Sequence, residues 1–235
     1  MQSVQAYHFW SLFGCSTIFT PLTIDEYAAK ALSTDQRSDG GSLTFPLLGL
    51  FGETGSLLSE VEKKQRDQAS YLGYAAAVSE ELGDVLWYLT IVANRGGLPL
   101  KDIIANVDRS CADWQQSEDA TLCFTALQPA IMQRPIELTA AFEKTLLRLA
   151  GEVGLLVTDH EAGRLTDNQS TLAGRLIAIM RTLIQAANES GVTIEAAATH
   201  QRFGACPLPS RWKSRPRKPP ENPQAARPAG PISSQ

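Results

Sequence analysis

The sequence has few of the residues that build disulfide frameworks and zinc sites. It contains four cysteines and three histidines in 235 residues. The cysteines are Cys15, Cys111, Cys123 and Cys206, and they form no C-x-x-C pair and have no histidine at the spacing of a zinc ligand. These absences exclude a disulfide scaffold and a structural zinc site. They favour a protein of the reducing cytoplasm.

Long hydrophobic runs are also absent. The most apolar N-terminal stretch, His8 to Thr20, lacks a basic start and a small-residue cleavage site, and it is too short to span a bilayer. We therefore expect no membrane anchor and interpret residues 1–21 as an N-terminal extension.

Acidic residues are scarce at the C-terminal end, although the whole chain has a net charge of −4. Residues 207–235 contain six basic residues, one acidic residue and eight of the 13 prolines. Proline removes backbone donors, and a segment with few apolar residues cannot offset its ordering entropy, so this tail should be disordered. A solvated basic tail is more common than a nucleic-acid-binding one, and we expect no nucleic-acid partner.

Strand-like alternation is missing, whereas apolar residues recur every three to four positions along most of the chain. This period predicts an all-α fold. The expected helices are Ile24–Leu32, Phe45–Lys64, Ala75–Asn94, Leu100–Trp114, Ile136–Val157, Leu172–Asn188 and Ile194–Arg202. Glycine and proline pairs mark the breaks between them.

An internal repeat organises these helices. Residues 47–57 and 146–156 are identical at seven of 11 positions without a gap, and Gly97 and Gly191 bring the following helices into register. The sequence therefore predicts a helical bundle built from two tandem repeats, over residues 22–118 and 136–206, joined by a linker over 119–135.

The second repeat lacks most of the acidic residues of the first. In this register Glu81 falls opposite Arg175 and Asp84 opposite Ala178, and only Glu152 and Asp159 remain. Two carboxylates with a basic residue nearby are a poor divalent-cation site. We interpret the second repeat as degenerate and structural.

Four acids of the first repeat are the candidate catalytic and metal-binding residues. Glu53 and Glu60 lie seven residues apart on one expected helix, and Glu81 and Asp84 lie three apart on the next. Both spacings place side chains on one face of a helix. Grouped carboxylates repel one another unless a divalent cation gathers them, so magnesium, with manganese as the alternative, is the expected cofactor.

Two strings carry a resemblance to a known family. Residues 49–55, GLFGETG, and residues 80–87, EELGDVLW, resemble the MazG-like all-α nucleoside triphosphate pyrophosphohydrolases, which are related to the dimeric dUTPases. The family has E-x-x-E on one helix and E-x-x-D on the next, and Glu81 and Asp84 match the second motif. The resemblance implies hydrolysis of a nucleoside triphosphate to the monophosphate and pyrophosphate, and a homodimer.

One position departs from that pattern, because Ser56 replaces the second glutamate of the first motif. A serine hydroxyl is a weak magnesium ligand and carries no charge. Glu60 lies on the same face but about 10 Å along the helix from Glu53, so it cannot fill the missing position. It could hold a second ion or a metal-bound water, and it or a ligand carboxylate could serve as the general base.

Phosphate binding requires positive or polar groups beside the acids. The candidate substrate-binding residues are Gln36, Lys63, Lys64, Arg66, Asn106 and Arg109. The two lysines could equally complement the dipole at the end of a helix, and Gln36 could belong to a polar turn. Trp87 and Tyr88 could stack on a base, but their apolar neighbours favour a place in the core.

A function of another class remains open at this point. A helical scaffold or sensor could bind magnesium–nucleotide without turnover, and Ser56 and the degenerate second repeat both motivate that alternative.

Overall fold

The computed structural model describes residues 21–35, 41–108, 122–128, 135–165 and 169–200. These ranges are helical, and their only β-type pairing is an isolated bridge between Thr23 and Cys123. The predicted all-α class is confirmed. Among these residues, no helix has the length and hydropathy needed to cross a bilayer.

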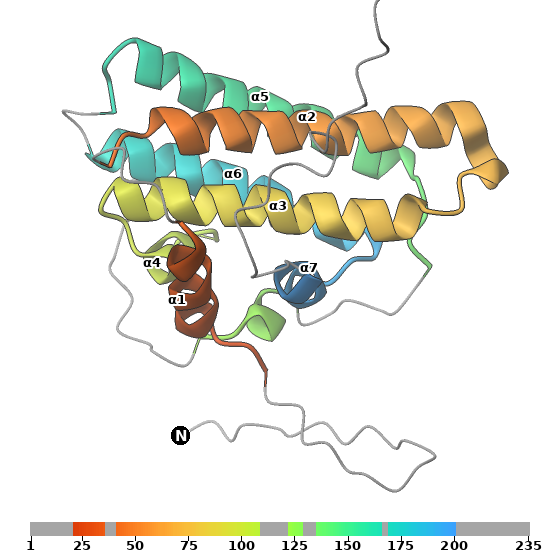
Figure 1. Ribbon diagram of the computed structural model, residues 1–235, viewed down its shortest axis with the longest axis horizontal. Helices are drawn as coiled ribbons and strands as arrows, with labels where there is room; N and C mark the ends of the chain where they lie inside the picture. Colours follow the sequence, from red (N-terminus) through yellow and green to blue (C-terminus); the bar gives the residue numbers. More distant parts are fainter. Residues whose placement is uncertain (1–20, 36–40, 109–121, 129–134, 166–168, 201–235) are drawn as a thin grey trace, which may run out of the picture.

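Four long helices form the body of the molecule. They are α2 (Thr44–Asp67), α3 (Tyr74–Arg95), α5 (Ala140–Glu161) and α6 (Gln169–Ser190). Helix α2 packs against both α3 and α5, and α6 closes the bundle by packing against α5 and α3 (Figure 1).

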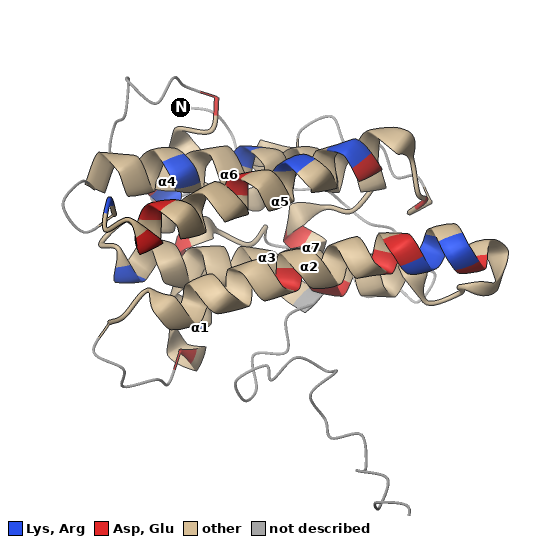
Figure 2. Cartoon of the chain, turned by 90° about the horizontal axis from the view of Figure 1, so that it is seen from above, with Lys and Arg blue, Asp and Glu red and all other residues tan. Residues whose placement is uncertain are grey.

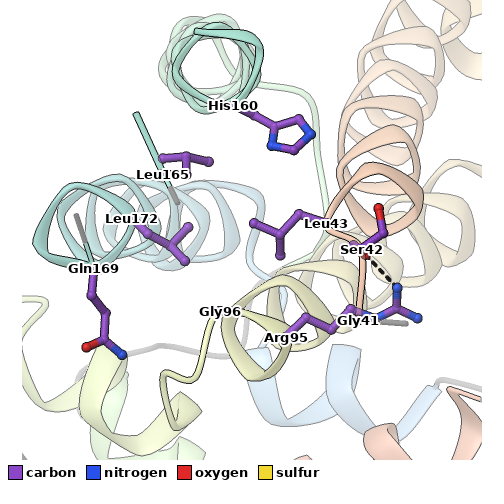
Figure 3. A pocket seen from close by; sticks show the side chains of 9 residues that line it. All are labelled: Gly41, Ser42, Leu43, Arg95, Gly96, His160, Leu165, Gln169 and Leu172. Carbon is purple, nitrogen blue, oxygen red and sulfur yellow. Dashed lines mark hydrogen bonds between the residues drawn. The ribbon is translucent and has the colours of Figure 1, made fainter. Parts of the chain in front are cut away.

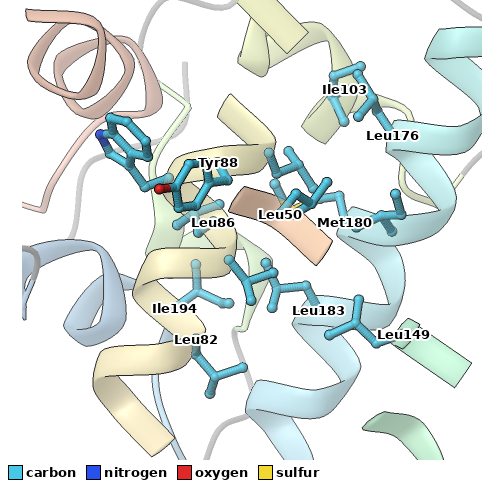
Figure 4. Packing of buried hydrophobic residues seen from close by; sticks show 14 of the residues in the cluster. Leu50, Leu82, Leu86, Tyr88, Ile103, Leu149, Leu176, Met180, Leu183 and Ile194 are labelled. Carbon is cyan, nitrogen blue, oxygen red and sulfur yellow. The ribbon is translucent and has the colours of Figure 1, made fainter. Parts of the chain in front are cut away.

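The core of the bundle is aliphatic. Leu82 and Leu86 of α3 point toward Met180 and Leu183 of α6, and Leu50 of α2 reaches into the same layer (Figure 4). All five side chains are fully buried. This packing fixes how α2 and α3 are rotated against each other, and therefore which polar residues face each other between them.

Shorter elements cover the side of α3 and α6 that faces away from α2 and α5 (Figure 1). They are α1 (Ile24–Thr34), α4 (Leu100–Ala105), η3 (Phe124–Leu127) and α7 (Ile194–His200), whereas η1 (Gln68–Ser70) lies in the α2–α3 turn at the end of the bundle. Helix α7 packs on α3, and α4 packs on α6. Helices α4 and α7 thus each contact the second long helix of the other half.

Three predicted helix boundaries were wrong by four residues or more. Helix α4 ends at Ala105 instead of continuing to Trp114, and Asn106 follows it as the cap, with its side-chain amide donating to the carbonyl of Asp102 at 2.7 Å. Asparagine offers the backbone such a local alternative to a further helical turn. Residues 109–114 lie outside the described ranges.

Both boundaries of α5 were also wrong, and the helix starts at Ala140, four residues after the predicted Ile136. Thr139 has an extended backbone, and its hydroxyl accepts a hydrogen bond from the amide of Phe142 at 3.1 Å. This is an N-cap, which satisfies an otherwise unpaired amide of the first turn and sets the start of the helix. The same helix continues four residues beyond the predicted end, to Glu161.

The two halves have the same order of elements, because each consists of two long helices followed by a short one. Gly97 and Gly191 adopt positive φ angles of 71° and 82° where each second long helix ends, a conformation that glycine adopts without strain. An origin of the two halves by duplication stays a prediction from the sequence.

The interval interpreted as a linker contains part of the fold. Phe124 of η3 is fully buried and packs edge-on against Tyr27 of α1, with ring centroids 5.2 Å apart. The N-terminal extension up to residue 20 and the proline-rich tail over 207–235 lie outside the described residues.

Candidate functional site

Three carboxylates meet between α2 and α3. Glu53 comes from α2, and Glu81 and Asp84 come from consecutive turns of α3. One oxygen of each lies within 4.8 Å of the others. The structure therefore brings together three of the four acids that the sequence singled out.

Burial makes this cluster electrostatically costly. Glu53 is only 5% exposed, and Glu81 and Asp84 are half-buried. Burial, followed by the neighbouring charges of Glu53 and Asp84, raises the pKa of Glu81 to about 8. Burial also raises the pKa of Glu53, although hydrogen bonds from Glu81 and Ser56 oppose that shift. Without a cation, the cluster holds a proton because three ionised groups cannot share this space.

One oxygen of the cluster has no hydrogen-bond partner in the part of the chain that the structure describes. The Oε2 atom of Glu81 is buried and accepts no hydrogen bond from any described residue. An unsatisfied buried carboxylate oxygen costs free energy, and such an atom in a native structure calls for an unseen proton or ion. The residues fit magnesium, because it is bound in proteins by a few carboxylates and completes its six oxygen ligands with water and phosphate.

Ser56 lies one helical turn after Glu53 and beside the cluster. Its hydroxyl lowers the pKa of Glu53 through a hydrogen bond. The serine therefore supports the ionised form of a neighbouring carboxylate instead of adding a fourth negative charge. The replacement of glutamate by serine at position 56 therefore affects the pKa of Glu53, which the spacing of the motif did not indicate.

Glu60 lies apart from the three converging acids. It is buried, and its carboxylate accepts hydrogen bonds from the ammonium group of Lys63 and the hydroxyl of Tyr71. Its charge still reaches the cluster, since it contributes to the raised pKa of Glu81. Glu60 thus holds a lysine and a tyrosine close to the three acids.

The remaining basic candidates on α2 have structural partners. Lys64 donates to the carbonyl of Gln68 at 2.7 Å and lies over the ring of Tyr74, so it satisfies the end of the helix. Arg66 is exposed and pairs with Glu62 and Asp67. Of the three basic residues after Glu60, only Lys63 is bound to one of the four candidate acids.

Asn106 follows α4 and is buried, with its amide bound to Asp102 as described above. Gln36 and Arg109 lie outside the described residues.

The two aromatic residues that follow Asp84, Trp87 and Tyr88, belong to the core, as the sequence favoured. Trp87 is 2% exposed and donates its indole N–H to the Thr34 hydroxyl at 3.0 Å, and Tyr88 is also buried.

Sequence reasoning missed Tyr71. It lies in the turn after η1, where the helical period is interrupted, so no periodic pattern assigned it to a face. Its hydroxyl nevertheless reaches back 11 residues to Glu60. A tyrosine next to an acidic helix was the only signal in the sequence, and it is a weak one.

A separate cavity of about 540 Å³ opens where α2 and α6 begin and where α3 and α5 end. Figure 3 shows Leu43, Leu172 and His160 facing into it, while Arg95 extends along one wall and binds the carbonyl of Ser42. Arg95 also forms a buried ion pair with Asp35 at 2.9 Å. Asp84 lies 11 residues before Arg95 on α3, about 16 Å along the helix, so the acids do not line this cavity.

The geometry of two paired helices carrying these acids agrees with the comparison against known families. Residues 44–109 match the model of the MazG nucleotide pyrophosphohydrolase domain. This segment is a MazG-like domain. The match covers α2, α3 and α4, including Glu53, Glu60, Glu81 and Asp84, and it leaves α5, α6 and α7 outside.

The similarity to this family is thus shown for residues 44–109. No curated protein and no solved structure matches the chain.

Proposed function

We propose that the MazG-like domain hydrolyses a nucleoside triphosphate to the monophosphate and pyrophosphate, with magnesium as cofactor and manganese as a substitute. The observation that carries this proposal is the convergence of Glu53, Glu81 and Asp84. It includes a buried oxygen of Glu81 that has no hydrogen-bond partner among the described residues. Three converging carboxylates are typical ligands of a hard divalent cation such as magnesium.

The three carboxylates would hold the ion on the wall between α2 and α3. Magnesium bound there neutralises the triphosphate and lowers the pKa of an attacking water. The chain itself would orient the substrate and receive the proton, since phosphate transfer requires little covalent chemistry from the protein.

Glu60 is the acid best placed to receive that proton. It stands outside the three converging carboxylates, close enough for its charge to act on Glu81. Lys63 and Tyr71 fix the orientation of its carboxylate. The same contact keeps the ammonium group of Lys63 near the site, where it can bind phosphate oxygens. Water would then attack the α-phosphorus, and the bond from that phosphorus to the oxygen that bridges it to the β-phosphate would break. Pyrophosphate would leave with that oxygen.

A hydrolysis assay over common and modified ribo- and deoxyribonucleoside triphosphates, with magnesium or manganese, tests the proposal by detecting pyrophosphate. We expect release with at least one substrate and none from the double variant Glu81→Gln, Asp84→Asn. Absence of release across the whole panel would refute the enzyme, and activity that survives the double variant would locate it elsewhere.

The second candidate function is a magnesium–nucleotide sensor without turnover. Ser56 favours it, because the domain has one carboxylate fewer than the family pattern to which it is similar. Calorimetric titration with magnesium and a non-hydrolysable nucleotide separates the two functions. A sensor binds the nucleotide with the cation and releases no pyrophosphate.

A further inference from the structure

The turn between α5 and α6 is flanked by a cluster of three charged side chains. Asp159, in the last turn of α5, is 3% exposed, and its carboxylate accepts hydrogen bonds from the Nε atoms of Arg164 and Arg175 at 2.7 and 2.6 Å. The two guanidinium groups share this one carboxylate, so the cluster has a surplus of one positive charge. Among the described residues, no other carboxylate forms an ion pair with either arginine.

Most hydrogen-bond donors of Arg175 are unused. A guanidinium group presents its N–H donors in a planar fork, and Arg175 spends only its Nε–H group, on Asp159. Neither terminal nitrogen of Arg175 donates to a residue that the structure describes. The side chain is 31% exposed, so a ligand can reach it from the solvent.

Two other arginines show the contrast. Arg95 binds Asp35 with Nε and one terminal nitrogen, and it binds the carbonyl of Ser42 with the other. Arg66 likewise uses all three nitrogens, on two acids of α2. The chain therefore satisfies every nitrogen of those two guanidinium groups. At Arg175 it leaves the terminal nitrogens to a partner from outside the described residues.

The cluster occupies the place in the second hairpin that the acids occupy in the first. The internal register aligns Arg175 with Glu81, and it aligns Asp159 with Glu60. The first hairpin gathers carboxylates at this place, which suits a cation. The second hairpin presents guanidinium groups there, and a reversed charge favours an anion.

The reversal of charge extends along the two helices. Helix α3 carries three acids and ends on an arginine, whereas α6 carries two arginines and has its single acid near its end (blue and red on α6 in Figure 2). No acid of α6 lies within three turns of Arg175, so the helix itself does not neutralise the guanidinium group. The charged residues are Glu80, Glu81, Asp84 and Arg95 on α3, and Arg175, Arg181 and Glu189 on α6.

We propose that Arg164 and Arg175 bind the phosphate group of an anionic ligand without a metal ion. A guanidinium fork matches two phosphate oxygens, and the charge-assisted hydrogen bonds that it donates are stronger than neutral ones. Asp159 holds the two guanidinium groups side by side and reduces their mutual repulsion. Free pyrophosphate and the phosphate chain of a nucleotide share the chemistry that this site recognises.

The test is calorimetric titration of the full-length chain with inorganic pyrophosphate in EDTA. Without divalent cations, the carboxylates of the first hairpin repel an anion, so binding there does not contribute. We expect one pyrophosphate per chain, with an affinity that falls as the salt concentration rises, because the contact is ionic and partly exposed.

Arg175→Lys is the variant that decides the site. Lysine can retain the ion pair with Asp159, so the protein should fold, but it lacks the terminal nitrogens of the guanidinium fork. The affinity for pyrophosphate should fall at least about tenfold, as expected for the loss of one charge-assisted hydrogen bond. Arg164→Gln, at the more exposed arginine, should also weaken binding.

Arg148→Gln is the matched control. It removes the same charge from an exposed position of α5, about three turns before Asp159. Its affinity for pyrophosphate should stay within about twofold of the wild type. An equal loss in Arg148→Gln and Arg175→Lys would show that only the overall charge matters, and would overturn the proposal.

Titration with adenosine monophosphate and adenosine triphosphate in EDTA distinguishes the two sources of the phosphate group. Tighter binding of pyrophosphate identifies a site for the free anion, and tighter binding of the triphosphate identifies a nucleotide site. Either result supports the proposal when Arg175→Lys weakens it. No binding of any of the three at millimolar concentration, or equal affinities in Arg175→Lys and the wild type, would refute it. These titrations involve neither metal nor turnover, so this site and the proposed function can fail independently.

Discussion

In the α2–α3 hairpin three carboxylates face one another, whereas in the α5–α6 hairpin the buried carboxylate of Asp159 faces two guanidinium groups. Arg164 and Arg175 donate to Asp159 at 2.7 and 2.6 Å. Arg175 is the residue that the internal register aligns with Glu81. The two hairpins therefore resolve the same problem, a buried negative charge, in opposite ways.

In the second hairpin, the buried negative charge of Asp159 is balanced by two arginines of the same chain. Hydrogen bonds from Arg175 and Arg164 hold the pKa of Asp159 below its usual value. In the first hairpin, burial and like charges raise the pKa of Glu81 instead, and no residue that the structure describes forms a hydrogen bond with its Oε2 atom. The buried carboxylate of the second hairpin is thus paired with guanidinium groups of the chain, whereas the proposed cation would supply the positive charge for the carboxylates of the first hairpin.

The largest predicted effect comes from removing a charge of the first hairpin. Glu81→Gln should lower kcat/KM for triphosphate hydrolysis at least about 100-fold, because a ligand of the cation is lost. The metal-free variant should also melt at a higher temperature, since it removes like-charge repulsion. Steady-state kinetics and thermal unfolding in EDTA measure the two effects.

Glu152→Gln is the matched control for that variant, because the internal repeat aligns Glu152 with Glu53 in the second hairpin. Its activity should stay within about twofold of the wild type, as for surface substitutions generally. Equal losses in both variants would contradict the assignment of the site to the first hairpin.

The next prediction concerns the second hairpin. Arg175→Met should lower the melting temperature by several degrees, because Asp159 would stay buried with only the more exposed Arg164 as its partner. Hydrolysis below the melting temperature should be unchanged. Adding Asp159→Asn should recover most of the loss, and a double variant that is less stable than Arg175→Met would argue against this pairing as the cause.

The two hairpins should also respond to pH with opposite signs. The pKa of Asp159 is lowered by folding, so its contribution to stability is present above its unfolded pKa of about 4 and is lost as the pH falls through the folded value. The pKa of Glu81 is raised to about 8, so in metal-free protein stability falls as the pH rises from about 4 toward 8.

Urea unfolding between pH 3 and 9 in EDTA separates these contributions. Asp159→Asn should remove the acid-side loss, and Glu81→Gln should flatten the decline between pH 4 and 8. Magnesium should restore stability in the wild type at high pH. A wild-type profile in EDTA that rises from pH 5 to 8 would be incompatible with the protonated cluster.

The smallest predicted effect tests the packing difference between the hairpins. Gly49 of α2 lies under the ring of Tyr88, and its aligned residue in α5 is the exposed Arg148. Gly49→Ala should cost about 1 to 3 kcal/mol of unfolding free energy, because a methyl group has no room there. Arg148→Ala should change it by less than about 0.5 kcal/mol.

A double-mutant cycle of Gly49→Ala with Tyr88→Thr sharpens that result. Threonine is the residue that the register places opposite Tyr88 in the second hairpin, as Thr182. The cost of Gly49→Ala should shrink in the Tyr88→Thr background, as measured by urea unfolding. Additive costs would show that the ring does not cause the glycine requirement.

Helical periodicity gave most of the fold before the structure was known. It predicted all four long helices, and the spacing of the acids predicted that up to four carboxylates could converge. The structure brings three of them together and leaves Glu60 apart. It failed where single side chains end or begin a helix, at Asn106 and Thr139, because a cap is a local hydrogen bond and does not alter the apolar period.

The amino-acid sequence by itself determined the helical class, the acidic strings of the first hairpin and their loss from the second, since these are properties of residue type and spacing. Tertiary structure alone decided which acids converge, that Glu60 binds Lys63 and Tyr71, and that Asp159 binds two arginines. Spacing fixes the face of a helix on which a residue lies. What that face meets depends on how the helices pack, and therefore on contacts between residues far apart in the chain.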